Sequence, residues 1–393
     1  MALPLAGTTV VSIEQAVAAP FATRQLADLG ARVIKIERPD GGDFARAYDT
    51  TVNGMSSYFV WLNRSKESLT LDLKSPEARL VVDRLIQRAD VFVQNLAPGS
   101  ADRMDLSSAT LRARHPRLIV CNVTGYGSSG PFARRKAYDL LVQGETGAIA
   151  ATGTPDSPSK VGISIADVAA GMYAYSSILA ALFARTRTHE GATIEVSLFD
   201  ALGEWMSAPM YYARYGGAAP TRSGASHASI APYGPFKTGD GQTILLGVQN
   251  AREWQRFCDL VLERPELTND DRFGTNPARV THRATLAAEI DRVFERLSAA
   301  DVVARLESAS IASARLNDLS EFAAHPQLSA RQRWTTVDSP VGPLEVLRPP
   351  AIVEGEQPAM GPIPALGEHT AAILTELGFD GPTIAAWKQK GLI

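Results

Sequence analysis

Short apolar stretches alternate with helical segments over residues 8–124, and this alternation constrains the fold more than any other feature of the sequence. Strands are expected at residues 8–13, 32–37, 68–73, 91–94 and 118–124. Such an order predicts an α/β fold with an open, mostly parallel sheet that carries helices on both faces. No GxGxxG motif follows the first expected strand, so the sequence does not support a nicotinamide or flavin dinucleotide as cofactor.

The chain changes character at residues 211–228, which are rich in Gly, Ala, Ser and Arg and are expected to form a linker or functional loop. Residues 229–330 should form a smaller α+β domain, which begins with a hairpin that turns at residues 239–241. The tail, residues 331–393, is too short for a core of its own. We therefore expect it to pack back on the large first domain, residues 1–210.

The charge balance and the cysteine content exclude several classes of protein. A formal net charge of −3 provides no general attraction to nucleic acid or to an anionic membrane. The two cysteines have no CxxC spacing and the six histidines have no metal-ligand spacing, so neither a disulfide framework nor a metal site is expected. The first twenty residues lack a signal-peptide pattern, and residues 168–184 predict a buried helix rather than a membrane span. These features predict a cytoplasmic protein.

Asp167 lies between an apolar, strand-like run at residues 161–166 and the most apolar helix of the chain. One interpretation is a helix N-cap, because an aspartate there accepts the free amide hydrogens of the first turn. The other is a nucleophile, whose charge the same amides and the helix dipole would preserve at neutral pH. Gly171, one turn further on, would then allow a substrate to approach closely. The two interpretations are compatible.

Four cations stand at expected strand ends or in adjoining loops of the first domain: Arg38, Lys74, Arg103 and Lys136. Ligands bind at strand ends in folds of this kind, so the set predicts a phosphate-bearing ligand, although each residue alone could be a solvated surface charge. Residues 125–131 form a glycine-rich loop without the Lys-Ser/Thr ending of a P-loop, and no GxSxG motif is present. The sequence thus supports neither nucleotide hydrolysis nor a serine hydrolase.

Several ordered runs, among them LNRSKESLTLDLKSPEA, VQNLAPG, KAYDLLVQ, ADVAAGMYA and IAPYGPF, closely resemble the class III CoA-transferase family, also called the CaiB/BaiF family. The resemblance implies an interlocked homodimer, in which each chain has a large Rossmann-like domain built from both termini and a small domain between them. It also implies that Asp167 is the catalytic aspartate and that CoA is a substrate, with no tightly bound cofactor. The residues that match the family's CoA-binding positions are Arg38, Leu71, Asp72, Leu73, Lys74, Asn95, Leu96, Arg103, Lys136, Ala137, Tyr138 and Asp139.

The activity that the resemblance implies is transfer of CoA from an acyl-CoA to a free carboxylic acid, through an aspartyl-acyl anhydride and an aspartyl-CoA thioester on Asp167. Residues 223–226 are the candidate for a loop that covers the site, and they depart from the longer all-glycine loop of formyl-CoA transferases. This departure argues against formate and oxalate. The segment HASIAPYGPF looks more like the branch that handles C4 and C5 dicarboxylates such as succinate, mesaconate, itaconate or citramalate. Arg214, Arg222 and His227 could bind the second carboxylate or belong to an exposed linker.

Two other functions stay open on this sequence. The same family contains α-methylacyl-CoA racemases, whose histidine falls where this chain has Tyr138, directly before Asp139. A phenol is a poor replacement for an imidazole in removing an α-proton, so racemization ranks second. The third function is a non-catalytic CoA-binding protein, which would retain the cations and would not need a nucleophile.

Overall fold

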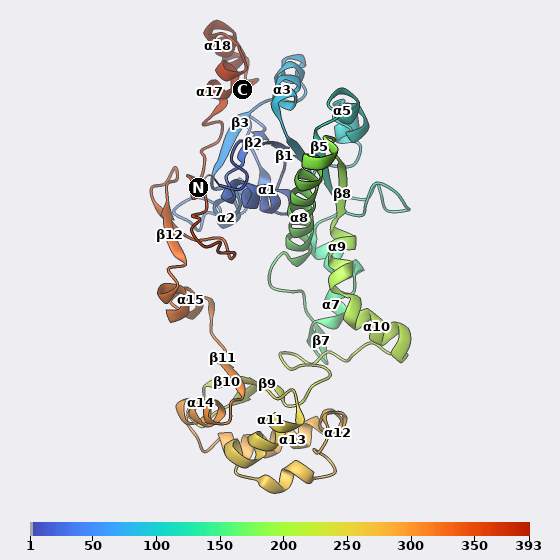
Figure 1. Ribbon diagram of the computed structural model, residues 1–393, viewed down its shortest axis with the longest axis vertical. Helices are drawn as coiled ribbons and strands as arrows, with labels where there is room; N and C mark the ends of the chain where they lie inside the picture. Colours follow the sequence, from blue (N-terminus) through green and yellow to red (C-terminus); the bar gives the residue numbers. More distant parts are fainter. Residues whose placement is uncertain (1–2) are drawn as a thin grey trace. The chain divides into compact units, whose positions relative to one another are not determined.

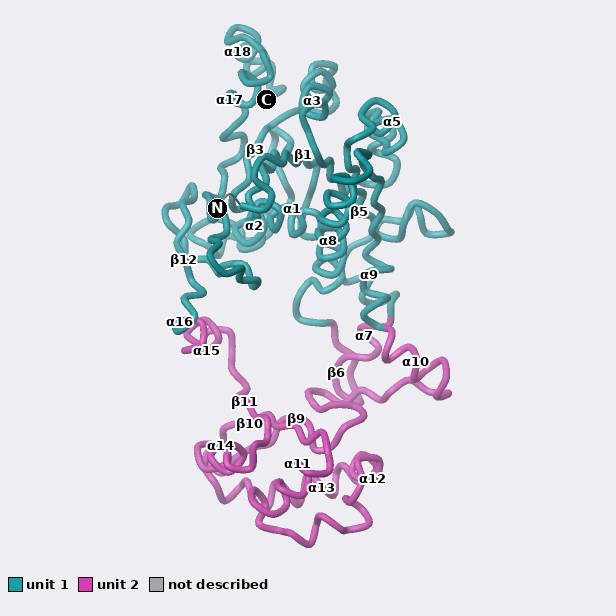
Figure 2. The backbone as a smooth tube through the Cα atoms, viewed as in Figure 1, with its two compact units in different colours: residues 1–146, 161–206, 329–393 teal, residues 147–160, 207–328 magenta. Residues whose placement is uncertain are grey.

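The computed structural model describes residues 3–393, which form two compact units (Figure 1, Figure 2). Unit 1 holds the chain up to Thr146 together with Val161–Met206 and Ser329–Ile393. Unit 2 holds Gly147–Lys160 and Ser207–Leu328.

Two stretches differ from the expected organisation. Residues 147–160 lie within the expected first domain, yet they pack in unit 2, because Arg222 donates hydrogen bonds to the carbonyls of Ala150, Thr154 and Pro155. Helix α10 (Ser207–Gly216) occupies the start of the expected linker. Residues 210–215 contain neither glycine nor proline, so the helix continues until two glycines end it.

The core of unit 1 is a six-stranded sheet in the order β3-β2-β1-β4-β5-β8, in which every strand pair is parallel. The expected open, parallel sheet is therefore confirmed. Its strands are β1 (Thr9–Ile13), β2 (Arg32–Glu37), β3 (Lys66–Thr70), β4 (Val91–Gln94), β5 (Ile119–Thr124) and β8 (Thr193–Ser197). The chain order reverses between β1 and β4, which leaves a crevice beyond the carboxyl ends of these strands.

Strand β3 begins earlier than its apolar pattern predicts, because it starts with the buried Lys66. Lys66 Nζ donates to Glu14 Oε1 at 2.7 Å and to the side-chain oxygen of Asn63 at 3.1 Å. The strand ends at Thr70, which pairs with Glu37 at the end of β2. A hydrophobicity pattern cannot identify a charged residue as part of a buried strand when its burial depends on partners that are buried with it.

Two layers of helices cover this sheet (Figure 1). One layer contains α1 (Ala18–Asp28) and α8 (Ile165–Thr188), which pack closely on each other. The other contains α3 (Pro76–Arg88), α5 (Ser108–Arg114), α17 (Thr370–Glu376) and α18 (Gly381–Gln389), whose apolar residues share one core with the sheet. Further elements of unit 1 are η1 (Phe44–Ala47), α2 (Ser57–Asn63), α4 (Ser100–Arg103), α6 (Asp139–Glu145), α9 (Leu198–Trp205), β12 (Trp334–Val337) and β13 (Leu344–Leu347).

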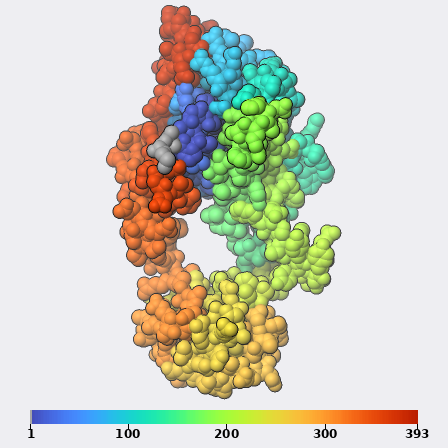
Figure 3. All heavy atoms as spheres, in the orientation of Figure 1, coloured from blue at the N-terminus to red at the C-terminus, as the bar shows by residue number. Residues whose placement is uncertain are grey.

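The carboxyl-terminal tail covers the edge of the sheet at β3. Thr70 N donates to Thr370 Oγ1 at 2.9 Å, and His369 N donates to the carbonyl of Ser68 at 3.0 Å. Beyond this contact, Trp387 of α18 packs in the core that α3 shares, so the red carboxyl-terminal end of the chain lies beside the light blue segment that contains α3 (Figure 3). An edge strand paired in this way offers fewer free backbone groups to another chain.

Helix α8 is buried along one face only. Its small residues at positions 166, 169, 170, 171 and 174 are buried, whereas Met172 is 37% and Phe183 65% exposed. By length and composition alone it is the helix, among residues 3–393, that could cross a membrane. At Gly171 a Cβ would lie 2.6 Å from the carbonyl of Ala18, so this glycine makes room for α1. The sequence had suggested that it makes room for a substrate.

Unit 2 is an α+β arrangement with its own core. The expected hairpin is present as β9 (Tyr233–Lys237) and β10 (Thr243–Gly247), and β11 (Ala312–Arg315) completes the antiparallel sheet. The side chains of Trp254, Phe257 and Phe294 fill the core beneath it. The remaining elements, some of which extend past the unit, are α7 (Ala148–Ala151), β6 (Gly153–Thr154), β7 (Ser157–Pro158), α11 (Ala251–Arg256), η2 (Phe257–Val261), η3 (Pro265–Asn269), α12 (Asn276–Thr281), α13 (Arg283–Phe294), α14 (Ala299–Ser308), α15 (Leu319–Ala323) and α16 (Pro326–Ala330).

The close packing of α1 on α8 predicts that Gly171→Ala lowers the free energy of unfolding by about 1–3 kcal/mol, because the new methyl group must push α1 away. Gly203→Ala in α9 is the matched control, since nothing lies within 4 Å of its Cβ position. The control should raise the stability by up to about 1 kcal/mol. Urea denaturation of both variants checks the prediction, and equal effects would contradict it.

Candidate active site

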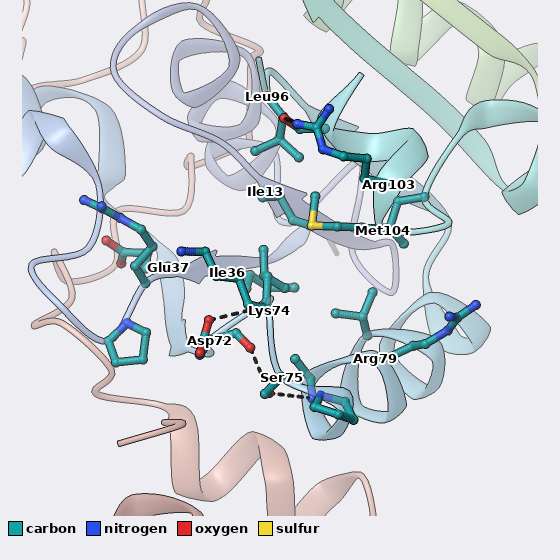
Figure 4. Close-up of a pocket in the computed structure, with 18 of the residues that line it drawn as sticks. Ile13, Ile36, Glu37, Asp72, Lys74, Ser75, Arg79, Leu96, Arg103 and Met104 are labelled. Atoms are coloured by element: carbon teal, nitrogen blue, oxygen red, sulfur yellow. Dashed lines mark hydrogen bonds between the residues drawn. The ribbon is translucent and has the colours of Figure 1, made fainter. Parts of the chain in front are cut away.

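A cavity of about 970 Å³ opens in unit 1 beyond the carboxyl ends of β1, β2 and β4 (Figure 4). This volume is at the upper end of the range for small-molecule sites. Its wall combines an apolar floor, including Ile13, Ile36 and Met104, with four cationic side chains: Arg38, Lys74, Arg79 and Arg103. The arrangement suits a long ligand with several negative charges, because guanidinium and ammonium groups bind phosphate through charge-assisted hydrogen bonds.

Half of the expected CoA-binding residues line this cavity: Arg38, Asp72, Leu73, Lys74, Leu96 and Arg103. The side chain of Leu71 is instead 1% exposed and belongs to the core beneath the cavity. Arg38 is held in place, since its guanidinium donates to the carbonyl of Gly42 and lies 5.2 Å from the centre of the Phe44 ring. The cavity thus joins residues that are far apart in the sequence.

Asn95 contacts the protein backbone. Its Oδ1 accepts a hydrogen bond from Gln15 N, and its Nδ2 donates to Gln15 O, both at 2.8 Å. The next residue, Ala16, has a φ of 63°, which is strained for a residue other than glycine, and its amide donates to Asp43 Oδ1. Gln15 lines the cavity, although nothing in its sequence context marked it. Asn95 therefore positions the loop that forms one wall of the cavity.

Asp167 lies in the first turn of α8, three residues after the N-cap. The N-cap is Ser164, and residues 161–164 are not a strand, so the expected strand-to-helix turn is wrong. The amides of Ala166 and Asp167 donate to Asp139 Oδ1 at 2.8 and 3.3 Å. Among residues 3–393, no group donates a hydrogen bond to the Asp167 carboxylate itself. Asp139, at the start of α6, therefore accepts the amide hydrogens of the first turn of α8, which the sequence had assigned to Asp167.

The environment of Asp167 disfavours its charge. Burial, and then the charge of Asp139, raise the pKa of Asp167 to about 7. The sequence-based expectation that helix amides keep this carboxylate ionised is therefore wrong, because those amides are bonded to Asp139. A pKa close to neutrality in a partly buried carboxylate is typical of catalytic groups.

Residues 44–61 are dense in aromatic residues, and the sequence did not disclose their role. Burial, and then the charges of Asp43 and Asp167, raise the pKa of Tyr48. Tyr48 is 50% exposed and meets Tyr58 edge to face, with ring centres 5.7 Å apart. An exposed aromatic pair of this kind can contact the acyl part of a substrate.

The segment of Lys136 to Asp139 lies at the start of α6, outside the lining of the cavity. Lys136 is exposed and Tyr138 is 71% exposed, whereas the Ala137 side chain occupies the space beside Gly125. Besides its bonds to α8, Asp139 accepts a hydrogen bond from Gln143 at 2.7 Å. The structure thus brings this segment to Asp167 and not to the other expected CoA-binding residues.

The expected dicarboxylate residues lie in unit 2 and are largely committed to its own structure. The guanidinium of Arg222 donates to three backbone carbonyls. The ring of His227 stacks on Tyr233, with centres 5.2 Å apart, and its Nδ1 accepts from Ser229 N. Arg214 lies over the ring of Tyr215 on α10. Arg214 is therefore the member of the set whose guanidinium has no hydrogen-bond acceptor among residues 3–393.

The expected covering loop, residues 223–226, is also tied down within unit 2. Gly224 N donates to the carbonyl of Gly153 at 2.9 Å, and Ser226 N donates to that of Ser223 at 3.0 Å. Two of its amides are therefore already bonded, which limits the number that this loop could offer to an oxyanion.

Comparison with known proteins gives consistent results. A family model described as CoA-transferase family III matches residues 5–370. A succinate–glutarate CoA-transferase of Agrobacterium fabrum is 34% identical over 95% of this chain and 96% of its own. An acetyl-CoA:oxalate CoA-transferase of Acetobacter aceti is 36% identical over 84% of each chain. The solved structure of a CaiB/BaiF family protein from Brucella suis, 35% identical, covers 96% of this chain and 100% of its own with a TM-score of 0.83.

The raised pKa of Asp167 predicts a pH-dependent cost to stability. In the unfolded chain an aspartate titrates near about pH 4, so the folded chain holds this proton more tightly, and stability is lost as the pH rises from about 4 to about 7. Asp167→Asn should therefore be more stable than the parent by about 1–3 kcal/mol at pH 8, with a gain that disappears towards pH 4. Urea denaturation across this range tests it, with Asp102→Asn as the exposed comparison. A gain independent of pH would contradict the assignment.

Proposed function

This chain belongs to CoA-transferase family III and is therefore an enzyme that transfers CoA; we propose that it exchanges CoA between dicarboxylic acids through a covalent intermediate on Asp167. One observation carries the proposal. Asp167 is a carboxylate without a hydrogen-bond donor among the described residues, and it lies in the same compact unit as a cavity lined by four cations. A nucleophile and a site for a phosphate-rich carrier are the two parts that the reaction needs.

The chemistry proceeds in four balanced steps. The ionised carboxylate of Asp167 attacks the thioester carbonyl of the donor acyl-CoA, which forms an aspartyl-acyl anhydride and releases CoA thiolate. The thiolate then attacks the aspartyl carbonyl, which frees the donor acid and leaves an aspartyl-CoA thioester. The acceptor carboxylate displaces this thiolate to form a second anhydride, and the thiolate finally attacks the acceptor acyl group. The new acyl-CoA leaves and Asp167 is restored as a carboxylate.

The environment of Asp167 suits this role. Because Asp139 receives the helix amides, the Asp167 carboxylate has little stabilisation to lose when it forms a bond to the substrate. The neighbouring negative charge of Asp139 disfavours the ionised ground state and is relieved when the neutral anhydride or thioester forms. Asp139 acts in this scheme as a positioning residue.

CoA fits the cavity through the chemistry of its lining. Arg38, Lys74 and Arg103 supply positive charge for phosphates, and Leu73 and Leu96 supply apolar surface for the pantetheine chain. In this proposal Leu71 and Asn95 act through the shape of the site, because one is in the core and the other holds the loop of Gln15. Lys136, Ala137 and Tyr138 would contact the substrate near Asp167.

Dicarboxylates are the proposed acids. A relative that covers nearly the whole chain is named for succinate and glutarate, which supports C4 and C5 substrates. The argument from residues 223–226 against oxalate receives no support, since a similarly close relative is named for oxalate. We therefore include oxalate among the acceptors to be tested. Arg214 is the favoured cation for the second carboxylate, because Arg222 donates to backbone carbonyls.

Racemization is the second candidate, and the geometry disfavours it. Tyr138 stands where the racemases have their histidine, and the Asp139 carboxylate accepts bonds from two backbone amides and from Gln143. A carboxylate held in this way is poorly placed to return a proton to a substrate. Exchange of the α-proton of a branched acyl-CoA in heavy water, without CoA transfer, would favour this alternative.

Two chains are proposed to interlock in a homodimer. The exposed apolar residues of α6 and α8 support this, because a monomer would leave them in water. These residues are Leu140, Leu141, Met172 and Phe183, each at least 37% exposed. Burial of the outer face of α8 by a second copy also accounts for its composition without a membrane. A cytoplasmic location is part of the same proposal.

The proposed mechanism predicts that Asp167→Ala lowers the transfer rate by at least about 10³-fold while CoA binding changes by less than about threefold, because the covalent route is lost and the cations remain. The assay supplies succinyl-CoA with glutarate, mesaconate, itaconate, citramalate, oxalate and formate, and records new thioesters and intact protein mass. The parent should show a CoA adduct on Asp167. Asp102→Asn serves as control, and transfer at the parent rate by Asp167→Ala would refute the mechanism.

The proposed dimer predicts that Phe183→Glu weakens self-association by at least about tenfold, since a charge would enter an apolar interface. Leu80→Glu on α3 is the matched control, because Leu80 is also exposed but lies away from α8. Sedimentation velocity of the three proteins measures the effect. A parent that sediments as a monomer would overturn the proposal.

A further inference from the structure

The cavity in unit 1 contains one cation that the family resemblance does not assign, Arg79 of helix α3. We propose that Arg79 contacts the 3′-phosphate on the adenosine of CoA and thereby makes the enzyme distinguish CoA from 3′-dephospho-CoA. The inference rests on the proposed function, because it takes CoA as the ligand of the cavity. It adds a determinant of carrier specificity to a site whose other cations were expected.

One end of the cavity lies towards the nucleophile. Glu37 is part of the lining at this end, and its Oε2 accepts a hydrogen bond from Asp43 N at 3.0 Å. Asp43 Oδ1 accepts in turn from Ala16 N at 2.8 Å, and two residues further on, the carbonyl of Ala18 lies where a Cβ on Gly171 of α8 would come within 2.6 Å. The contacts from Glu37 through Asp43 and the start of α1 therefore lead to α8, whose first turn holds Asp167, so the reactive thioester belongs at this end.

Arg79 lies at the other end. Figure 4 shows Glu37 and Arg79 on opposite sides of the cavity, with Lys74 between them. CoA carries its thioester at one end and its adenosine with the 3′-phosphate at the other, with the diphosphate between. A thioester directed towards Asp167 therefore places the diphosphate near Lys74 and the adenosine near Arg79.

The guanidinium of Arg79 is free to take a phosphate. Its Nη2 donates to Asp105, and the remaining N–H groups have no partner among residues 3–393. This ion pair is open to water, with the two side chains 55% and 48% exposed, so it contributes little and a second anion can share or displace it. A phosphate monoester carries nearly two charges, and the planar guanidinium matches its oxygens better than an ammonium would.

The test measures the affinity of CoA and of 3′-dephospho-CoA for the full chain and its variants by titration calorimetry. Arg79→Gln should weaken CoA binding roughly tenfold or more and leave 3′-dephospho-CoA binding unchanged within about twofold. Asp105→Asn removes the competing carboxylate and should strengthen the binding of CoA alone. Arg88→Gln is the matched control, because it removes the same charge from the same helix at a residue outside the cavity, and it should alter neither ligand.

The outcomes separate this inference from the proposed function. An equal loss of both ligands in Arg79→Gln, or no loss of either, overturns the assignment of the 3′-phosphate while CoA binding by the parent still supports the cavity. Failure of the parent to bind CoA overturns both. Arg79 is an exposed helix residue, so its variant should fold, and an unchanged thermal transition confirms that a loss of binding is local.

Discussion

A buried set of charged side chains holds together the part of unit 1 on which the site depends. Lys35 and Lys66, on two neighbouring strands, bind Glu14 and Asp43, and all four side chains are fully buried or nearly so. Burial lowers the pKa of Lys66 to about 8, while the surrounding carboxylates outweigh burial and raise the pKa of Lys35. Such a network adds little net stability, but loss of one partner costs about 3–5 kcal/mol, so it selects a single arrangement. Through Asp43 it fixes the strained backbone of Ala16 and with it the wall of the cavity.

Competition for hydrogen-bond donors also explains why the Asp167 carboxylate stays unbonded. A helix end has only a few free amides, and here two of them bind Asp139 from another helix. Asp167 is left partly buried beside a second carboxylate, which is unfavourable for folding and favourable for a group that must form a covalent bond. The backbone-bonded Asp139 and the chemically free Asp167 thus divide the structural and the reactive roles between two aspartates.

Each unit has a core of its own, yet apolar side chains remain on its surface. In unit 1 they follow the outer face of α8, and in unit 2 they gather on α10, where Tyr211, Tyr212 and Tyr215 are 49% or more exposed. Faces of this kind are normally covered by another protein surface. A second copy would cover them without any change in the fold of either unit, which connects the composition of α8 with the proposed dimer.

From sequence alone, the parallel sheet, the hairpin of unit 2 and the importance of Asp167 could be predicted, because period-two apolar runs, turn residues and ordered motifs are local signals. Local patterns failed where a residue's role depends on partners distant in the chain. Lys66 extends β3 because Glu14 neutralises it, Gly171 serves α1, and Arg222 binds carbonyls about seventy residues away. Only the tertiary structure decided which aspartate caps α8 and which stays free, and only it placed Gln15 and Arg79 in the cavity wall. Hydrogen-bond partners and burial arise from folding in space, so no window of sequence contains them.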